Sequence, residues 1–225
     1  RRVPAGKKLV THGHRVSFAY VAAEVLAGLA AARVVGRAAV DVVAWNQLGC
    51  LSPHVIYVQN GAPVSPERFA EMLADELERL EQTEPRGPLS VEDAAAVASR
   101  RSLYEVRAAH VPETRHWSSK GSTAWTVVCE ADPLFQVSCL NRFIYVKGVE
   151  NLDQAMQAAE AVRGRVSTVA VAAPEHQVEQ MALNLARWGA SRICQIGKMQ
   201  NPPLTWRHDG RPVLGDLITW TDLEY

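Results

Sequence analysis

The feature that most constrains the fold is an alternation of short β-branched segments with amphipathic helical segments. The segment 54–59 reads His-Val-Ile-Tyr-Val-Gln, and a helix is predicted over 66–80, where Ser65 and Pro66 form a helix start. Further strands are predicted at 123–129, 142–147, 167–172 and 192–196, and further helices at 152–163 and 174–188. Strands separated by helices of this length pair in parallel through right-handed crossovers. The predicted fold class is therefore α/β, with a mostly parallel sheet and flanking helices.

The segment 16–45 is rich in Ala, Val and Leu, and it predicts two buried, closely packed helices. Ser17 is the expected cap of the first helix, and Gly36 is expected to separate it from a second helix at 37–47. Glu24 and the charged group at 33–41 argue against a membrane span, because a central acid is costly in hydrocarbon.

Composition excludes several classes of function. Lys plus Arg is 24 and Asp plus Glu is 24 in 225 residues, so no net field favours nucleic acid or an anionic membrane. The four cysteines form no CxxC pair, which fits neither a zinc ribbon nor a disulfide-stapled domain and favours a reducing cytoplasm. Nothing before Leu9 resembles a signal peptide and the first residue is Arg1, so we expect the chain to begin inside a longer protein.

The most informative stretch runs from Trp45 to Pro53, where a helical segment ends, Cys50 occupies a short turn, and a strand follows at once. Exposed turn amides beside a thiol in such a turn are expected to lower its pKa and to hold an oxyanion formed on a substrate carbonyl. The alternative from sequence pattern alone is a buried structural cysteine.

The residues 46–58, Asn-Gln-Leu-Gly-Cys-Leu-Ser-Pro-His-Val-Ile-Tyr-Val, resemble the nucleophile region of the aldehyde dehydrogenase superfamily. They are most similar to the acyl-CoA reductases related to the fatty-acid reductase subunit of bacterial luminescence systems. In that family a Gln three residues before the Cys, here Gln47, and a Ser-Pro pair after it, here beginning at Ser52, recur. The blocks 8–17, 192–203 and 206–210 resemble the family in the same order, so the resemblance covers nearly the whole chain.

The resemblance implies an aldehyde-dehydrogenase-like catalytic domain and a two-step reaction. Cys50 attacks an acyl-CoA or acyl-carrier thioester, and hydride from NADPH then reduces the acyl-enzyme to an aldehyde, with no metal required. Gln47, Ser52, His12 and His14 are the residues expected near the substrate or the oxyanion. The family also implies a homo-oligomer or a multi-subunit reductase complex.

One departure from the superfamily favours reduction. Hydrolytic aldehyde dehydrogenases carry a water-activating Glu in a Glu-Leu-Gly-Gly-Lys-like turn, whereas the similar turn here, 12–17, has no carboxylate. Glu24 is the candidate for a displaced base. His12 and His14 lie on one side if 9–14 is a strand, and the alternative for them is a turn pair with structural hydrogen bonds.

Asp132 and Phe135 resemble the superfamily's Glu-Ile-Phe segment, whose Glu binds the nicotinamide ribose, although the acid is one position out of register. Cys129, Cys139 and Cys194 are predicted core residues, and 208–210 is predicted to be a structural turn. No metal site is predicted, because no third ligand has a recognisable spacing beside the two histidines.

The domain prediction is that residues 1–225 form the nucleophile-bearing catalytic domain, and that an N-terminal dinucleotide-binding domain is absent from this chain. Two alternatives remain open for the function. One is an aldehyde dehydrogenase working in the oxidative direction. The other is a non-catalytic scaffold or partner subunit with the same fold, in which Cys50 is unreactive.

Overall fold

The computed structural model describes residues 3–4, 6–7, 9–212, 214–215 and 217–225. Its central element is a seven-stranded sheet in the order β3-β4-β5-β2-β1-β6-β7, in which only β3 and β4 pair antiparallel. The strands are β1 (Val16–Val21), β2 (Pro53–Gln59), β3 (Arg115–Ser118), β4 (Thr126–Glu130), β5 (Phe143–Val149), β6 (Val166–Ala172) and β7 (Ile193–Gln195). The helices are α1 (Gly28–Val43), α2 (Pro66–Thr83), α3 (Val91–His110), α4 (Leu152–Ala158) and α5 (Glu175–Trp188).

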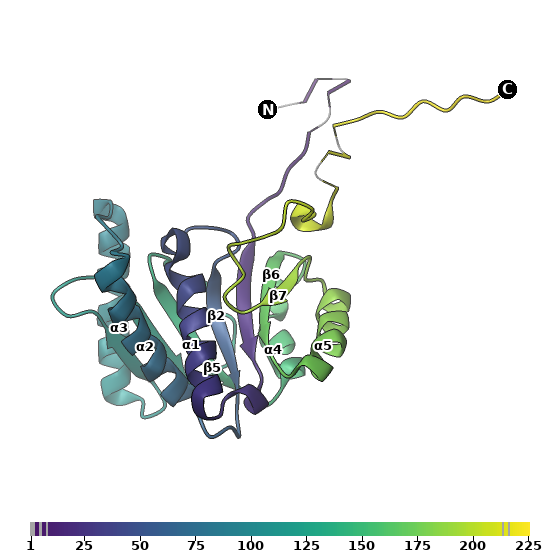
Figure 1. Ribbon diagram of the computed structural model, residues 1–225. Coiled ribbons are helices and arrows are strands. Elements are labelled where there is room, and N and C mark those ends of the chain that lie inside the picture. Colours follow the sequence, from purple (N-terminus) through teal and green to yellow (C-terminus); the bar gives the residue numbers. More distant parts are fainter. Residues whose placement is uncertain (1–2, 5, 8, 213, 216) are drawn as a thin grey trace.

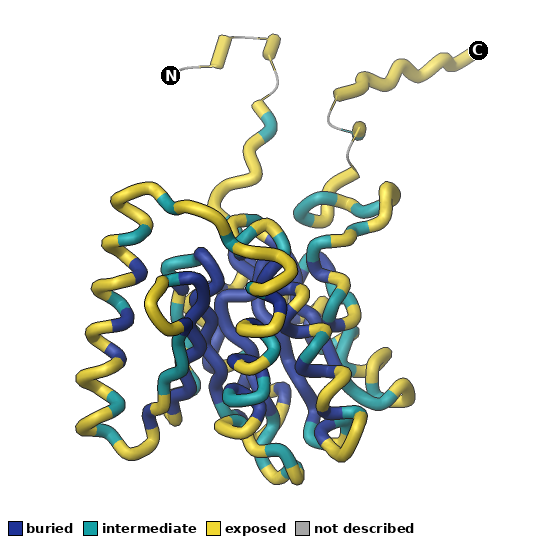
Figure 2. The backbone as a smooth tube through the Cα atoms, turned by 60° about the vertical axis from the view of Figure 1, so that its left-hand side comes forward, coloured by how far each residue is buried: buried dark blue, intermediate teal, exposed yellow. Residues whose placement is uncertain are grey.

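Helices cover both faces of the sheet (Figure 1). Helices α1 and α2 pack on one face, with Val42 and Leu73 in the core, and α3, α4 and α5 pack on the other, with Tyr104 and Leu185 in the core. A parallel sheet covered on both faces needs apolar residues on both sides of each strand. The inner strands are accordingly buried along almost their whole length (Figure 2).

The amino ends of the parallel strands lie on the side of the molecule where both chain ends extend (Figure 1). The segment before β1 and the segment after β7 meet on this side, which we call the amino edge of the sheet. None of the helices in the described part of the chain is both long and apolar enough to cross a membrane.

The predicted α/β class is confirmed, and so are most of its elements. β2 and α2 lie where the sequence places them, and the Ser65 hydroxyl accepts a hydrogen bond from Arg68 N at 3.1 Å. Ser90 caps α3 in the same way, accepting from Asp93 N at 3.0 Å. Caps of this kind stabilise a helix by about 1 kcal/mol each.

The prediction of two helices in 16–45 is wrong. Residues Val16–Val21 form β1, which lies between β2 and β6 in the sheet, and a single helix, α1, runs through Gly36. The sequence Val-Ser-Phe-Ala-Tyr-Val contains β-branched and aromatic residues that favour a strand. The Ala-rich segment that follows it led us to predict a helix over both. Ser17 is therefore a strand residue and not a helix cap. At Gly36, an added Cβ would approach Glu76 of α2 at 3.6 Å, so the two helices lie close there.

Three smaller features also differ from the prediction. The segment 9–14 is not a strand, because β1 begins only at Val16, and its neighbour Lys8 lies outside the described residues. The helix predicted over 152–163 ends at Ala158 and continues as a 3-10 turn, Glu160–Val162. The short edge strand β3 was not predicted, because Arg-His-Trp-Ser contains no apolar run.

Candidate active site

Cys50 lies in a tight turn at the amino edge, between α1 and β2, as the sequence predicts. A 3-10 turn, Ala44–Gln47, follows α1, and Trp45, Asn46 and Gln47 all have left-handed φ values, of 55°, 52° and 63°. Non-glycine residues in this region are strained, so the surrounding structure must hold them. Strain of this kind is characteristic of functional sites, and here it immediately precedes the thiol.

Side chains of the turn itself hold it in place. The buried Gln47 amide donates from Nε2 to Pro53 O at 2.7 Å and to Phe143 O at 3.0 Å, which ties the turn to β2 and β5. Asn46 donates from Nδ2 to Arg86 O and accepts from Arg142 Nε, both at 3.1 Å. Gln47 is thus a structural anchor of the turn, and it is not among the residues that line the space above Cys50.

Ser17 of β1 fixes the backbone of Cys50. Its hydroxyl donates to Cys50 O at 2.7 Å and accepts from Thr168 N at 3.1 Å, so it links the turn to β6. The register of β1 shifts here on both sides. Ser17 pairs with Pro53 and Phe18 with Val55 across β2, while Val16 pairs with Val166 and Ser17 with Thr168 across β6. Each shift is a bulge that leaves one extra residue, His54 in β2 and Ser167 in β6.

A pocket of about 250 Å³ opens above the Cys50 turn at the amino edge. Cys50 is exposed, and the walls combine cationic or neutral polar residues with apolar ones and include no Asp or Glu. The lining residues are Gly13, His14, Arg15, Leu48, Gly49, Cys50, His54, Val137, Ser138 and Leu140.

A larger pocket, of about 580 Å³, lies between α1, α5 and β7. Its only thiol, Cys194, has a pKa raised to about 11 by burial, so the smaller pocket is the better candidate for covalent chemistry.

The pKa of the Cys50 thiol is raised above its ordinary value. Partial burial among the surrounding atoms is the main cause, and the negative charge of Asp209 is the second. The Cys50 backbone amide, the nearby Ser167 hydroxyl and the charge of Arg15 act in the lowering direction. We expected the turn amides to lower the pKa of Cys50, and this expectation is wrong. The backbone amide does act to lower the pKa, but desolvation of the thiol raises it by more.

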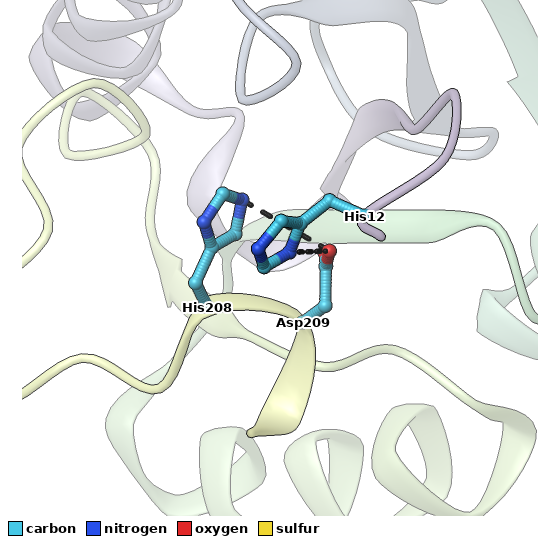
Figure 3. Close-up of side chains that lie close together, drawn as sticks. All are labelled: His12, His208 and Asp209. Atoms are coloured by element: carbon cyan, nitrogen blue, oxygen red, sulfur yellow. Dashed lines mark hydrogen bonds and ion pairs between the residues drawn. The ribbon is translucent and has the colours of Figure 1, made fainter. Parts of the chain in front are cut away.

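Asp209 belongs to a cluster that joins the C-terminal segment to the segment before β1 (Figure 3). Its side chain is fully buried and accepts from His12 Nδ1 at 2.9 Å, and Arg15 Nε lies 3.4 Å from its other oxygen. Asp209 itself has a left-handed φ of 53°. The His208 ring stacks on the His12 ring, with centroids 4.3 Å apart. The negative charge of Asp209 raises the pKa of the Cys50 thiol. The turn at 208–210 therefore affects the candidate nucleophile, in addition to any structural role.

Three possible metal-ligating atoms, one each from His12, His208 and Asp209, lie within 4.8 Å of one another. Imidazole binds a metal through a lone pair in the plane of its ring. The planes of the two rings are tilted by only 15° and are stacked, so their lone pairs do not converge on one point. The arrangement suits a hydrogen-bonded ion cluster better than a metal centre.

The acyl-CoA reductase (LuxC) family model matches residues 1–220. The chain belongs to the acyl-CoA reductase (LuxC) family. No protein of curated function matches the sequence.

The chain is similar in fold to solved structures of the aldehyde dehydrogenase superfamily. A mutant of proline utilization A from Bradyrhizobium japonicum is 16% identical, with a TM-score of 0.65 over 86% of this chain and 20% of that one. The aldehyde dehydrogenase KauB from Pseudomonas aeruginosa is 12% identical, with a TM-score of 0.61 over 87% and 40%. A 1-pyrroline-5-carboxylate dehydrogenase from Thermus with bound NAD is 14% identical, with a TM-score of 0.57 over 86% and 37%. This chain therefore spans 20 to 40% of the length of these matched chains.

Within this acyl-CoA reductase fold, the structure gathers some of the predicted site residues and separates others. His14 lines the Cys50 pocket, whereas His12 is bonded to Asp209 beside it. Ser52 is buried and its hydroxyl accepts from Gln200 Nε2 at 2.6 Å, so it fastens the C-terminal segment to the turn. Glu24 follows the carboxyl end of β1, at the opposite edge of the sheet from Cys50, where it accepts from Gln177. The structure does not place Glu24 as a base for Cys50.

The two residues proposed for cofactor binding lie apart from each other. Asp132 follows the carboxyl end of β4, is exposed, and accepts from Leu134 N at 3.0 Å. The loop then returns along the sheet, and Phe135 packs edge-on against Phe18 and His54. A strand of five residues spans about 16 Å, so Asp132 is separated from the amino edge by roughly that distance. The structure brings Phe135 near the Cys50 pocket and leaves Asp132 outside it.

His54, Ser167 and Asp209 are residues of the site that sequence reasoning missed. Asp209 could have been identified from the sequence, because it lies within the block 206–210 that resembles the family. His54 lies inside the nucleophile block but reads there as an ordinary strand residue. Ser167 carries no signal, since its role depends on a bulge between two strands.

Cys50 is expected to be the first thiol modified by brief iodoacetamide treatment, because it is the exposed one. Cys129 is buried, Cys139 and Cys194 are partly buried, and burial raises the pKa of each. The labelling rate of Cys50 is expected to rise with pH beyond the ordinary thiol range, since its own pKa is raised. Peptide mass spectrometry measures the order, and faster labelling of any of the other three would contradict this assignment.

Proposed function

We propose that the protein reduces an acyl thioester to an aldehyde through an acyl group carried on Cys50. The observation that carries the proposal is the exposed Cys50 thiol on the lining of the pocket at the amino edge, in a chain of the acyl-CoA reductase family. Because this chain spans only part of the solved relatives, the activity of the whole protein is included in the proposal.

The first half-reaction is thioester exchange. The Cys50 sulfur forms a bond to the acyl carbon, the bond from that carbon to the sulfur of CoA or of an acyl carrier breaks, and the thiol proton ends on the departing thiol. Exchange of one thioester for another is close to balanced in energy, so it depends mainly on positioning and on hydrogen-bond donors for the oxyanion. A raised thiol pKa is compatible with this step, because the proton is transferred in the reaction and the thiol is protected from oxidation in the resting enzyme.

The pocket chemistry favours reduction over hydrolysis of the acyl-enzyme. No carboxylate lines the pocket, Glu24 lies at the opposite edge, and the Asp209 carboxylate near Cys50 is buried and paired with His12, so neither acid is placed in the pocket to activate water. The apolar walls, Leu48, Val137 and Leu140, suit the start of an acyl chain.

Bound NADPH supplies the hydride for the second half-reaction. Two observations support a cofactor site outside these residues: no strand in the described ranges passes into a helix through a glycine-rich turn, and Asp132 lies away from Cys50. We therefore include in the proposal that residues 1–225 are the nucleophile-bearing domain and that the cofactor is held by a separate dinucleotide-binding domain of the protein.

The proposal is tested by separating the two half-reactions. The protein with its dinucleotide-binding domain is expected to gain one acyl mass on incubation with an acyl-CoA and to release aldehyde when NADPH is added. The 225-residue chain alone is expected to gain the acyl mass and to keep it in the presence of NADPH. Intact-mass spectrometry and aldehyde trapping measure both.

Three results would count against parts of this proposal. Aldehyde release by the 225-residue chain alone would contradict the domain assignment. Rapid conversion of an aldehyde and NADP to a free acid, without thioester exchange, would indicate an oxidative dehydrogenase. An unreactive Cys50 with no acyl adduct would indicate a scaffold or partner subunit with this fold.

A further inference from the structure

His54 occupies an unusual position at the Cys50 pocket. The bulge between β1 and β2 leaves it unpaired with β1, four residues after the thiol. Bulges reorient the side chain of the extra residue and are frequent beside active sites. The His54 ring is almost fully buried, packs edge-on against Phe135, and lines the same pocket as Cys50.

The protonation state of His54 follows from one contact. Ser138 N donates a hydrogen bond to His54 Nδ1 at 3.1 Å. A backbone N–H can only donate, so Nδ1 must be the acceptor nitrogen and the proton of the neutral ring must be on Nε2. Burial, assisted by the charge of His14, lowers the pKa of His54 to about 4, so the ring stays neutral at physiological pH.

These facts limit what His54 can do. Its only basic nitrogen is already occupied by Ser138, so it is not placed to take the proton of Cys50. Its remaining polar group is Nε2–H, which makes no hydrogen bond to the described residues and is not closed off from solvent. An N–H donor without a protein partner, on the wall of a pocket that also holds a nucleophile, is suited to an oxygen atom of the bound substrate.

We propose that His54 is a catalytic hydrogen-bond donor whose Nε2–H binds the carbonyl oxygen of the acyl thioester as Cys50 attacks it. The role rests on the proposed function and adds a specific group to its first half-reaction. As the sulfur adds to the acyl carbon, the electron pair of the carbonyl moves onto this oxygen. A neutral donor fixed by Ser138 stabilises that negative charge without having to reorient.

The test uses two substitutions that keep different halves of the imidazole. In His54→Asn the side-chain oxygen can replace Nδ1 as acceptor for Ser138 N, but no donor reaches the position of Nε2. In His54→Gln the amide N–H₂ can replace Nε2–H as the donor. Two rates are measured on the purified protein, acylation of Cys50 by an acyl-CoA and alkylation of Cys50 by iodoacetamide. Only acylation develops charge on a carbonyl oxygen.

The acylation rate is expected to fall by about 100-fold to 1000-fold in His54→Asn, the loss typical of one oxyanion donor, and by far less in His54→Gln. The alkylation rate is expected to stay close to that of the unsubstituted protein in both. Undiminished acylation of His54→Asn would overturn the proposal, and so would a parallel loss of alkylation, which would assign His54 to the thiol or to folding. If the unsubstituted protein is alkylated but never acylated, the proposed function itself fails, and the role of His54 fails with it.

Discussion

Replacement of Cys50 by alanine is expected to abolish aldehyde formation while leaving the fold intact. Removal of the nucleophile eliminates the covalent route, and losses of this kind reach roughly 10⁶-fold in rate. The fold should tolerate the change because Cys50 is exposed and Ser17 binds its backbone carbonyl, which alanine retains. Single-turnover aldehyde formation from an acyl-CoA and NADPH, in the protein with its cofactor domain, measures the effect.

Cys194→Ala is the matched control for this experiment. Cys194 is partly buried in β7 and lines the larger pocket between α1 and α5, away from the amino edge. Its replacement should leave turnover within a few-fold of the parent. Aldehyde formation by Cys50→Ala at a rate near that of the parent would require a mechanism without the acyl-enzyme, and the assignment of the Cys50 pocket would then be wrong.

Local sequence signals were sufficient for much of the fold. Ser65-Pro66 marked the start of α2 because capping is determined by residues within one turn. The β-branched run in β2 was similarly clear. β1 was missed because its neighbours in the sheet, β2 and β6, are distant in sequence, and tertiary pairing decided the conformation of a segment that precedes an Ala-rich helix.

The sequence predicted the turn that holds Cys50, but it did not predict the residues that surround this turn in the folded protein. The turn that holds Cys50 follows from a helix end beside a strand start. The left-handed residues before it do not, because Gln47 and Asn46 are held there by β2, β5 and the segment at Arg86. Asp209 lies 159 residues from Cys50 in the chain, and only the folded structure brings its charge to the thiol.

The predicted lowering of the Cys50 pKa failed for a related reason. Sequence indicates which amides are near a thiol, but it does not indicate how much water the folded protein removes. At Cys50 the removal of water and the charge of Asp209 exceed the effect of the amide, the Ser167 hydroxyl and Arg15. Burial acts in the same way on His54, where it favours the neutral ring.

The buried neutral His54 is expected to make the folded protein less stable as the pH falls from about 6.5 to about 4. In the unfolded chain the imidazole takes up a proton near its ordinary pKa of 6.5, whereas in the folded protein it does so only near its pKa of about 4. Between these values the unfolded state binds more protons, so acid favours unfolding. A pKa lowered by this much corresponds to about 3 kcal/mol of unfolding free energy, all of it retained above pH 6.5 and lost by pH 4.

The measurement is the free energy of unfolding in denaturant at several pH values, for the parent and for His54→Asn, which does not titrate. The difference between the two should change by about 3 kcal/mol from pH 7 to pH 4, with the parent losing stability relative to the variant.

Asp41→Asn provides a comparison of opposite sign. Burial raises the pKa of Asp41 to about 6 although its carboxylate accepts from Gly197 N and Met199 N, so ionisation of Asp41 destabilises the folded state as the pH rises from about 4 to 6. Difference curves for His54→Asn and Asp41→Asn should therefore slope in opposite directions across the same pH range. A flat curve for His54→Asn would mean that the folded ring takes up a proton near pH 6.5, as the unfolded chain does. A protonated ring donates from both nitrogens and cannot accept from Ser138 N, so a flat curve would contradict the buried, neutral ring on which the assignment of Nε2–H depends.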